Sequence, residues 1–188
     1  MILSPVPVEA ATGEVAEIYA GDVDLFGHVT EHTKVMALNP EAHHAFEALV
    51  HAIQPSLGSR AYRLITLAAA GALASQPCLL AHGGFARRQF DDEQLERIGR
   101  DFHDAGLTEA EVAMMDYAVK ISTDAAAMTD DDVAVLRGHG FDDRQILDIT
   151  LAAAARNYYS RALSALGVVD EVPASLPTGV RDALLSKA

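Results

Sequence analysis

The sequence holds one cysteine, Cys78, and a histidine four residues later, His82. On a helix, residues four apart lie on the same face, one turn from each other. A thiol beside an imidazole is a nucleophile–base pair or a thiol–proton-relay pair. The spacing therefore predicts that Cys78 and His82 form the reactive centre of the protein.

The residues before Cys78 predict the start of a helix. Ser75 can act as the N-cap, and Pro77 falls in the first turn, where its missing N–H is tolerated. Cys78 would then lie near the third helical position, where the partial positive charge of the helix end favours a thiolate. A lone cysteine can also be a small buried apolar residue, and His82 can be a core histidine bonded to a backbone carbonyl. Both interpretations stay open at this point.

The segment from His28 to His32 matches H-x-x-E-H, an inverted zinc-protease signature. That chemistry needs both histidines on one helix face and a third ligand further on. Gly27 and the β-branched residues that follow indicate that the helix begins after His28, so the two rings would not align. The sequence favours solvated or interface histidines over a zinc site, and we expect no metal. The same interpretation applies to the histidines of the next expected helix, His43, His44 and His51.

Composition excludes several classes of function. Half of the 188 residues are apolar, which is typical of a globular chain, and the net charge of −13 argues against nucleic acid and anionic membranes as partners. A single cysteine cannot form an intramolecular disulfide, which suits a reducing compartment. The first residues do not resemble a signal peptide, and no apolar run is long enough to span a bilayer. We therefore expect a cytoplasmic protein.

Apolar residues recur at helical spacing along most of the chain, and no convincing strand pattern occurs. The pattern predicts an all-α fold of about eight helices in a single domain, residues 1–188, with an extended arm at 1–11 and a tail at 169–188. Expected caps include Asn39 before Pro40, Thr108 and Asp142. We expect helices over residues 12–19, 31–38, 41–53, 60–74 and 75–88, then from 91 to a stop at 106, from 108 to 122, from 129 to 138 and from 142 to 166, with a last turn at 180–185.

Several segments occur in an informative order. Cys78-x-x-x-His82 is followed by an acidic helix, by Asp-Tyr-Ala-Val-Lys at residues 116–120 and by Arg-Asn-Tyr-Tyr-Ser-Arg at residues 156–161. In this order they resemble the carboxymuconolactone decarboxylase superfamily, in its alkylhydroperoxidase D-like, peroxidase-related branch. The likeness runs from about residue 12 to residue 168. It implies an alkylhydroperoxidase D-like helical bundle that assembles as a homo-oligomer.

The resemblance also implies roles for particular residues. Members with peroxidase activity carry C-x-x-C-x-x-x-H on this helix, so Cys78 would attack the peroxide and His82 would belong to the proton relay. Ser75 stands where the family has its resolving cysteine, and Arg63 stands near its relay glutamate. Ser75 cannot form a disulfide, and Arg63 cannot act as a base near neutral pH. An inward-pointing Arg63 would instead stabilise a Cys78 thiolate.

Three functions follow from these observations. The first is a thiol-dependent peroxidase or antioxidant protein in which Cys78 reduces a hydroperoxide and an external thiol reduces the resulting sulfenic acid. The second resembles the superfamily's lactone decarboxylases, with His82 as acid or base and Arg63 or Arg161 holding the carboxylate of a small-molecule substrate. The third is a non-catalytic oligomeric remnant. None requires a cofactor, and we expect Asn157 and Arg161 to be packing groups.

Overall fold

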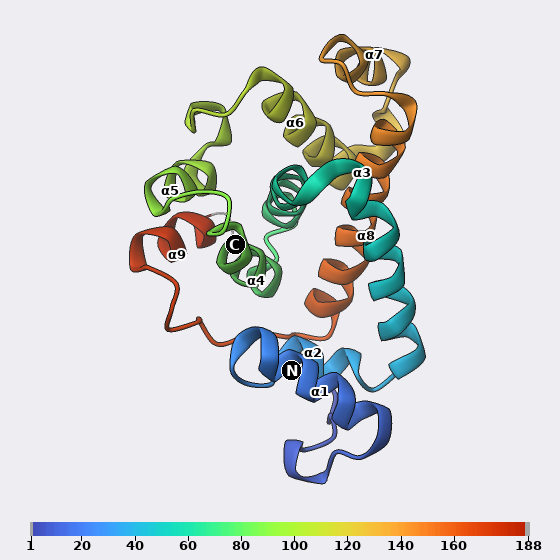
Figure 1. Cartoon of the computed structure of the whole chain (residues 1–188), viewed down its shortest axis with the longest axis vertical. Helices are drawn as coiled ribbons and strands as arrows, with labels where there is room; N and C mark the ends of the chain where they lie inside the picture. The colour runs from blue at the N-terminus through green and yellow to red at the C-terminus, as the bar shows by residue number, and fades with distance from the viewer. Residues whose placement is uncertain (1, 187–188) are drawn as a thin grey trace.

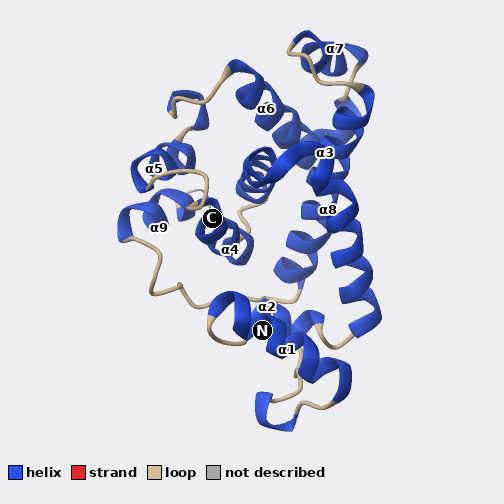
Figure 2. Ribbon diagram, in the orientation of Figure 1, coloured by secondary structure: helices blue, strands red, loops and turns tan. Residues whose placement is uncertain are grey.

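The computed structural model describes residues 2–186, and nine α-helices and three short 3-10 helices form this part of the chain, with no strand in it (Figures 1 and 2). The all-α fold expected from the apolar spacing is confirmed. None of the described helices is long and apolar enough to cross a membrane. The α-helices are α1 Gly13–Phe26, α2 Glu31–Met36, α3 Pro40–Ala72, α4 Gln76–Ala86, α5 Asp92–Arg100, α6 Glu109–Asp124, α7 Asp130–Gly138, α8 Asp143–Ala165 and α9 Thr178–Leu185.

The three expected caps are confirmed. The side chain of Asn39 accepts a hydrogen bond from the Ala42 N–H at 2.9 Å, and Thr108 and Asp142 open capping boxes. These bonds satisfy amide hydrogens that have no partner within the helix, so each fixes where its helix begins. The cap of α8 matters most for function, because α8 carries residues of the site described below.

The first helix was expected to end after residue 19, near Gly21, and that prediction is wrong. α1 continues to Phe26, and Gly27 ends it with φ of 80°. A glycine inside a helix costs about 1 kcal/mol relative to alanine but does not by itself stop the helix. The stop needs a residue in the left-handed conformation, and Gly27 supplies it. The longer α1 brings Phe26 to the candidate site.

The two helices expected at residues 41–53 and 60–74 are one long helix with a kink between them. α3 runs through Pro55, and only Gly58 leaves the helical conformation, with φ of 75° and ψ of 163°. Glycine adopts this backbone without a Cβ clash. The part of α3 after the kink is buried from Leu64 to Ala70, and α3 packs against α8, α6 and α4 (Figure 1).

The tail is part of the core. The expected last turn at 180–185 is a helix, α9, whose buried residues include Val180 and Leu184. It packs on α5 and α4, where glycines leave room for it (Figure 1). A Cβ on Gly99 would lie 2.8 Å from the backbone of α9. The expected helix from 91 to 106 is shorter than predicted: α5 ends at Arg100, and a 3-10 turn at Phe102–Asp104 follows.

The expected extended arm at residues 1–11 is partly helical. Val8–Ala10 form a 3-10 turn. The arm lies on its own chain, since the Ile2 N–H donates to the Leu166 carbonyl and the Tyr19 hydroxyl donates to the Val6 carbonyl.

Candidate active site

The start of α4 places the cysteine as expected. The helix begins at Gln76, so Cys78 is its third residue, and Ser75 occupies the N-cap position. The Ser75 hydroxyl makes no cap bond and is buried without a hydrogen-bond partner among the described residues. Cys78 and His82 are both buried, with 3% and 8% of their surface exposed. Ser75 is not among the residues that line the cavity beside them.

The Cys78 sulfur accepts two hydrogen bonds from α8. The Nη1 of Arg156 and the hydroxyl of Ser160 each lie 3.3 Å from Sγ. Arg156 and Ser160 are four residues apart, so they share one face of their helix. An anionic sulfur is the form that best accepts from a cation and a hydroxyl together. Arg156 and Ser160 are therefore the two donors placed to stabilise negative charge on the sulfur.

Arg156 is a buried cation whose partner is the sulfur. Its side chain is 5% exposed, it forms no ion pair with a carboxylate among the described residues, and its Nε has no hydrogen-bond partner there. Burial by itself disfavours the charge, but the neighbouring Cys78 raises the pKa of Arg156 above its ordinary value. The guanidinium stays charged and stabilises negative charge on the sulfur.

His82 is held by the other arginine. Its Nδ1 lies 3.0 Å from the Nη1 of Arg63. Because a guanidinium only donates, Nδ1 accepts and the remaining proton of the neutral ring lies on Nε2. Burial, followed by the positive charges of Arg156 and Arg63, lowers the pKa of His82 well below its ordinary value. His82 is therefore neutral near pH 7.

Arg63 does not take the position expected of it. It bonds to His82 instead of Cys78, and its guanidinium lies over the Phe85 ring at 4.8 Å from the centroid. Arg156 is the cation that contacts the sulfur, and neither Arg63 nor Arg161 lines the cavity. Arg161 donates to the Ser122 carbonyl at 3.1 Å, which is the packing role expected of it.

A cavity of about 190 Å³ opens beside Cys78 and His82. Residues from α1, α2, α3, α4 and α8 line it, among them the aromatic residues Phe26, Phe46, Phe85 and Tyr159. A space of this size and character suits a small, largely apolar molecule. The cavity, the cysteine and the two buried cations together make this the candidate active site.

Two further histidines line the same cavity. His43, on α3, has a buried Nδ1 without a partner among the described residues. His32, on α2, bonds through Nδ1 and through its backbone N–H to Asp170. The sequence pattern did not assign either ring to the site.

His28 lies before α2 and is exposed, so the two histidines of H-x-x-E-H do not share a helix face, as expected. Within residues 2–186, no cluster of three or more histidine, cysteine or carboxylate side chains is placed to hold a metal.

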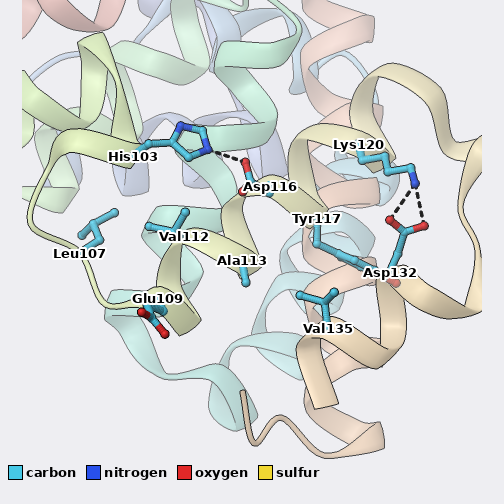
Figure 3. A pocket seen from close by; sticks show the side chains of 10 residues that line it. All are labelled: His103, Leu107, Glu109, Val112, Ala113, Asp116, Tyr117, Lys120, Asp132 and Val135. Carbon is cyan, nitrogen blue, oxygen red and sulfur yellow. Dashed lines mark hydrogen bonds and ion pairs between the residues drawn. The ribbon is translucent and has the colours of Figure 1, made fainter. Parts of the chain in front are cut away.

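A larger pocket, of about 560 Å³, lies between α6 and α7 (Figure 3). Four of its polar side chains form two pairs: Lys120 lies 2.7 Å from both oxygens of Asp132, and His103 lies 2.9 Å from Asp116. It contains no nucleophile beside a base. Its larger volume does not make it the better candidate site, because the reactive groups lie in the Cys78 cavity.

No family model matches the sequence, and no curated protein matches it. Solved structures do resemble it. A peroxidase-related protein from Ralstonia eutropha, described as an alkylhydroperoxidase AhpD core, is 23% identical with a TM-score of 0.79 over 89% of this chain and 91% of its own. A peroxidase-related protein from Silicibacter sp. is 26% identical with a TM-score of 0.78 over 94% of this chain and 93% of its own.

A third similar structure has another activity in its name. The debrominase Bmp8, in a cysteine-to-alanine variant bound to 2,3,4-tribromopyrrole, is 16% identical with a TM-score of 0.73 over 100% of this chain and 98% of its own. The similar structures therefore share a fold while differing in described chemistry.

These findings agree with the resemblance seen in the sequence: the architecture is helical, two of the similar structures are peroxidase-related, and polar groups surround Cys78. The chain has the helical fold of the alkylhydroperoxidase D-like, peroxidase-related structures.

Proposed function

We propose that this protein is a thiol-dependent peroxidase that works with one cysteine. The observation that carries the proposal is the environment of Cys78, whose sulfur lies on a cavity wall and accepts hydrogen bonds from Arg156 and Ser160. A buried cation beside a thiolate at the start of a helix is the arrangement that activates cysteine as a nucleophile. A buried structural cysteine needs no such partners.

The reaction begins with attack of the sulfur on a hydroperoxide. The S–O bond forms as the O–O bond breaks, the departing oxygen takes a proton and leaves as an alcohol, and Cys78 becomes a sulfenic acid. Because the chain has no second cysteine, an external thiol condenses with the sulfenic acid and releases water. A second external thiol then displaces Cys78 and forms the disulfide. In total, one hydroperoxide and two thiols give an alcohol, a disulfide and water.

The residues around the sulfur have distinct roles in this scheme. Arg156 and Ser160 hold the thiolate. His82, neutral and with its proton on Nε2, donates a hydrogen bond to bound peroxide. The aromatic side chains of the cavity favour a small organic hydroperoxide. We further propose that the protein acts as a homo-oligomer in the cytoplasm, where reduced thiols are abundant.

The test is the intact mass after brief treatment with cumene hydroperoxide, with and without a sulfenic-acid trap such as dimedone. The native protein should gain one oxygen, or one trap molecule when dimedone is present, and a small thiol should return it to its starting mass. Cys78→Ala should show neither change. If native Cys78 resists peroxide while iodoacetamide modifies it readily, the peroxidase proposal is wrong.

A bromopyrrole is a second candidate substrate, because the cavity has aromatic walls and the fold resembles that of the debrominase. The thiolate would attack a bromine, and the electron pair of the C–Br bond would go to the ring carbon, which takes a proton. External thiols would then displace bromide and form a disulfide. Bromide release from 2,3,4-tribromopyrrole in the presence of a thiol, lost in Cys78→Ala, would support this candidate over hydroperoxides.

The acid–base alternative has less support. His82 is neutral and its Nδ1 is engaged by Arg63, while the arginines expected to hold a carboxylate lie outside the cavity lining. A lactone screen that gave turnover in both the native protein and Cys78→Ala would favour that alternative. A protein with neither activity would favour the non-catalytic remnant.

A further inference from the structure

We infer that His32, oriented by Asp170, is the general acid of the Cys78 cavity, the group that protonates the oxygen leaving from the hydroperoxide. The inference rests on the proposed peroxidase chemistry and assigns it a catalytic residue. Attack on a peroxide expels a strongly basic oxygen, and a positioned acid speeds such a step by about 10²–10⁴-fold. His82, the histidine that the family resemblance suggests, is in the wrong charge state for that task.

The ring of His32 belongs to the wall of the cavity. It comes from α2, and its side chain is 12% exposed. It makes edge-on contacts with Phe26 and Tyr159, with ring centroids 5.9 and 6.1 Å apart. The Arg156 guanidinium lies 5.5 Å from the centroid of the same Tyr159 ring. His32 and Arg156 therefore both contact the Tyr159 ring at the wall of the cavity.

Asp170 sets the orientation of His32. It comes from the segment between α8 and α9, and its carboxylate accepts from the backbone N–H of His32 at 3.0 Å and from Nδ1 of the ring in a short contact. Its backbone is held in turn by Gln76, the first residue of α4, through bonds of 2.8 and 3.1 Å. Gln76 is two residues from Cys78. One aspartate thus fixes His32 relative to the helix that carries the nucleophile.

The hydrogen bonds around His32 place an acceptor beside each ring nitrogen. The hydroxyls of Thr30 and Thr33 each lie 2.8 Å from a different oxygen of Asp22, a buried carboxylate. The Thr30 hydroxyl donates its one hydrogen to Asp22 or to Thr33, so its oxygen is an acceptor toward the Nε2 of His32, 3.3 Å away. Both ring nitrogens of His32 therefore face acceptors, Asp170 at Nδ1 and Thr30 at Nε2. Two carboxylates lie close to the ring, Asp170 directly and Asp22 through Thr30.

The other histidines of the cavity lie in different surroundings. His82 is close to the charges of Arg156 and Arg63, and burial together with these charges lowers its pKa. Burial also lowers the pKa of His43, more than the nearby Glu47 raises it. Each of these two rings is neutral near pH 7. Histidines in surroundings of opposite charge divide the acid and base roles of a site, and His32 is the one whose ring nitrogens both face acceptors, which is the arrangement of a proton donor.

The proton to be transferred lies on Nε2. Its bond to Thr30 is long for an N–H···O bond, so an oxygen bound in the cavity can replace Thr30 as the acceptor. As the sulfur attacks and the O–O bond breaks, His32 gives this proton to the departing oxygen, which leaves as an alcohol or as water. The neutral ring then takes a proton from solvent, and the carboxylate of Asp170 again stabilises the cation.

The test compares two oxidants on His32→Gln, by stopped-flow measurement of Cys78 oxidation. Hydrogen peroxide expels hydroxide, a strongly basic leaving group, and needs an acid. Peracetic acid expels a carboxylate, whose acid has a pKa of about 4, and needs none. His32→Gln should slow the reaction with hydrogen peroxide by about 100-fold and leave the reaction with peracetic acid within about threefold of native.

Two further variants keep the test decisive. His28→Gln replaces the other histidine of the H-x-x-E-H segment, which is exposed and does not line the cavity, and should leave both rates unchanged. Asp170→Asn should show the same dependence on the oxidant as His32→Gln, with a loss of about tenfold for hydrogen peroxide. Equal losses with both oxidants would make His32 a structural residue and overturn the inference. Native Cys78 that resists both oxidants would overturn the peroxidase proposal itself, a distinguishable outcome.

Discussion

Replacing Arg156 by methionine should separate the reactivity of Cys78 from the stability of the fold. Methionine approximates the length of arginine without its charge, so the volume between α4 and α8 stays largely filled. The change removes the guanidinium that donates to Sγ at 3.3 Å, and it leaves Ser160 as the remaining donor to the sulfur. The fraction of Cys78 present as thiolate should fall.

The size of the effect follows from the contacts. A hydrogen bond that involves a charged group contributes about 1.5–3 kcal/mol, and a neutral one about 1 kcal/mol. At about 1.4 kcal/mol per tenfold, Arg156→Met should slow alkylation of Cys78 at pH 7 by about 10- to 100-fold. Ser160→Ala should slow it by about fivefold. Stability should change little or rise, because Arg156 is a buried cation with an unpaired Nε whose desolvation already opposes folding.

The assay is the rate of iodoacetamide alkylation, followed by intact mass from pH 6 to 9, with urea unfolding on the same samples. Arg161→Met is the matched control, because Arg161 lies on the same helix and donates to a backbone carbonyl away from the sulfur. Native rates in Arg156→Met at every pH would refute the reasoning. So would a larger loss in Ser160→Ala than in Arg156→Met, since the charge would then not be the main source of activation.

Four shorter predictions concern the fold, the thiol and the assembly. Gly99→Ala should lower the free energy of unfolding in urea by about 1–3 kcal/mol, because its Cβ would lie 2.8 Å from the backbone of α9, whereas Gly84→Ala, which meets nothing within 4 Å, should not. Ser75→Cys should form a disulfide with Cys78 after peroxide treatment, measured as a loss of two hydrogens. The unfolded chain takes up a proton at His82 below about pH 6.5, while burial and then the nearby arginines keep the folded ring neutral, so the free energy of unfolding decreases as the pH is lowered. His82→Gln should abolish this contribution of His82, so the difference in unfolding free energy between native protein and variant should be smaller at about pH 5 than at about pH 7.5. Light scattering should show an oligomer, and a stable 20 kDa monomer at micromolar concentration would contradict that expectation.

Local signals in the sequence predicted the helices well, except where glycine decided a boundary. The caps at Asn39, Thr108 and Asp142 were predicted because a cap depends on residues within one turn. The conformations of Gly21 and Gly58 were harder to predict, because a glycine can stay helical or leave the helix, and its tertiary neighbours decide which. Periodicity alone carries no information about those neighbours.

The residues of the candidate site show the same difference between local signals, which the sequence reveals, and tertiary contacts, which it does not. Cys78 and His82 were predicted from their spacing, which is a local property of one helix. His32 and Asp170 were not, because their pairing joins residues 138 positions apart. Asp170 lies in a segment that the sequence marked only as tail, and a carboxylate in a loop has no pattern that distinguishes it from a solvated one.

Arg156 and Ser160 did leave a signal that could have been used. They are four residues apart on the buried face of α8, which is the same spacing as Cys78 and His82 on α4. A charged residue on the buried face of a helix needs a partner, because an unpaired buried charge is strongly destabilising. Since no carboxylate on α8 shares that turn, the partner had to come from another element, and that partner is the sulfur of Cys78 at the start of α4. The contact of Arg156 thus identifies the Cys78 sulfur as a candidate reactive group independently of the family resemblance.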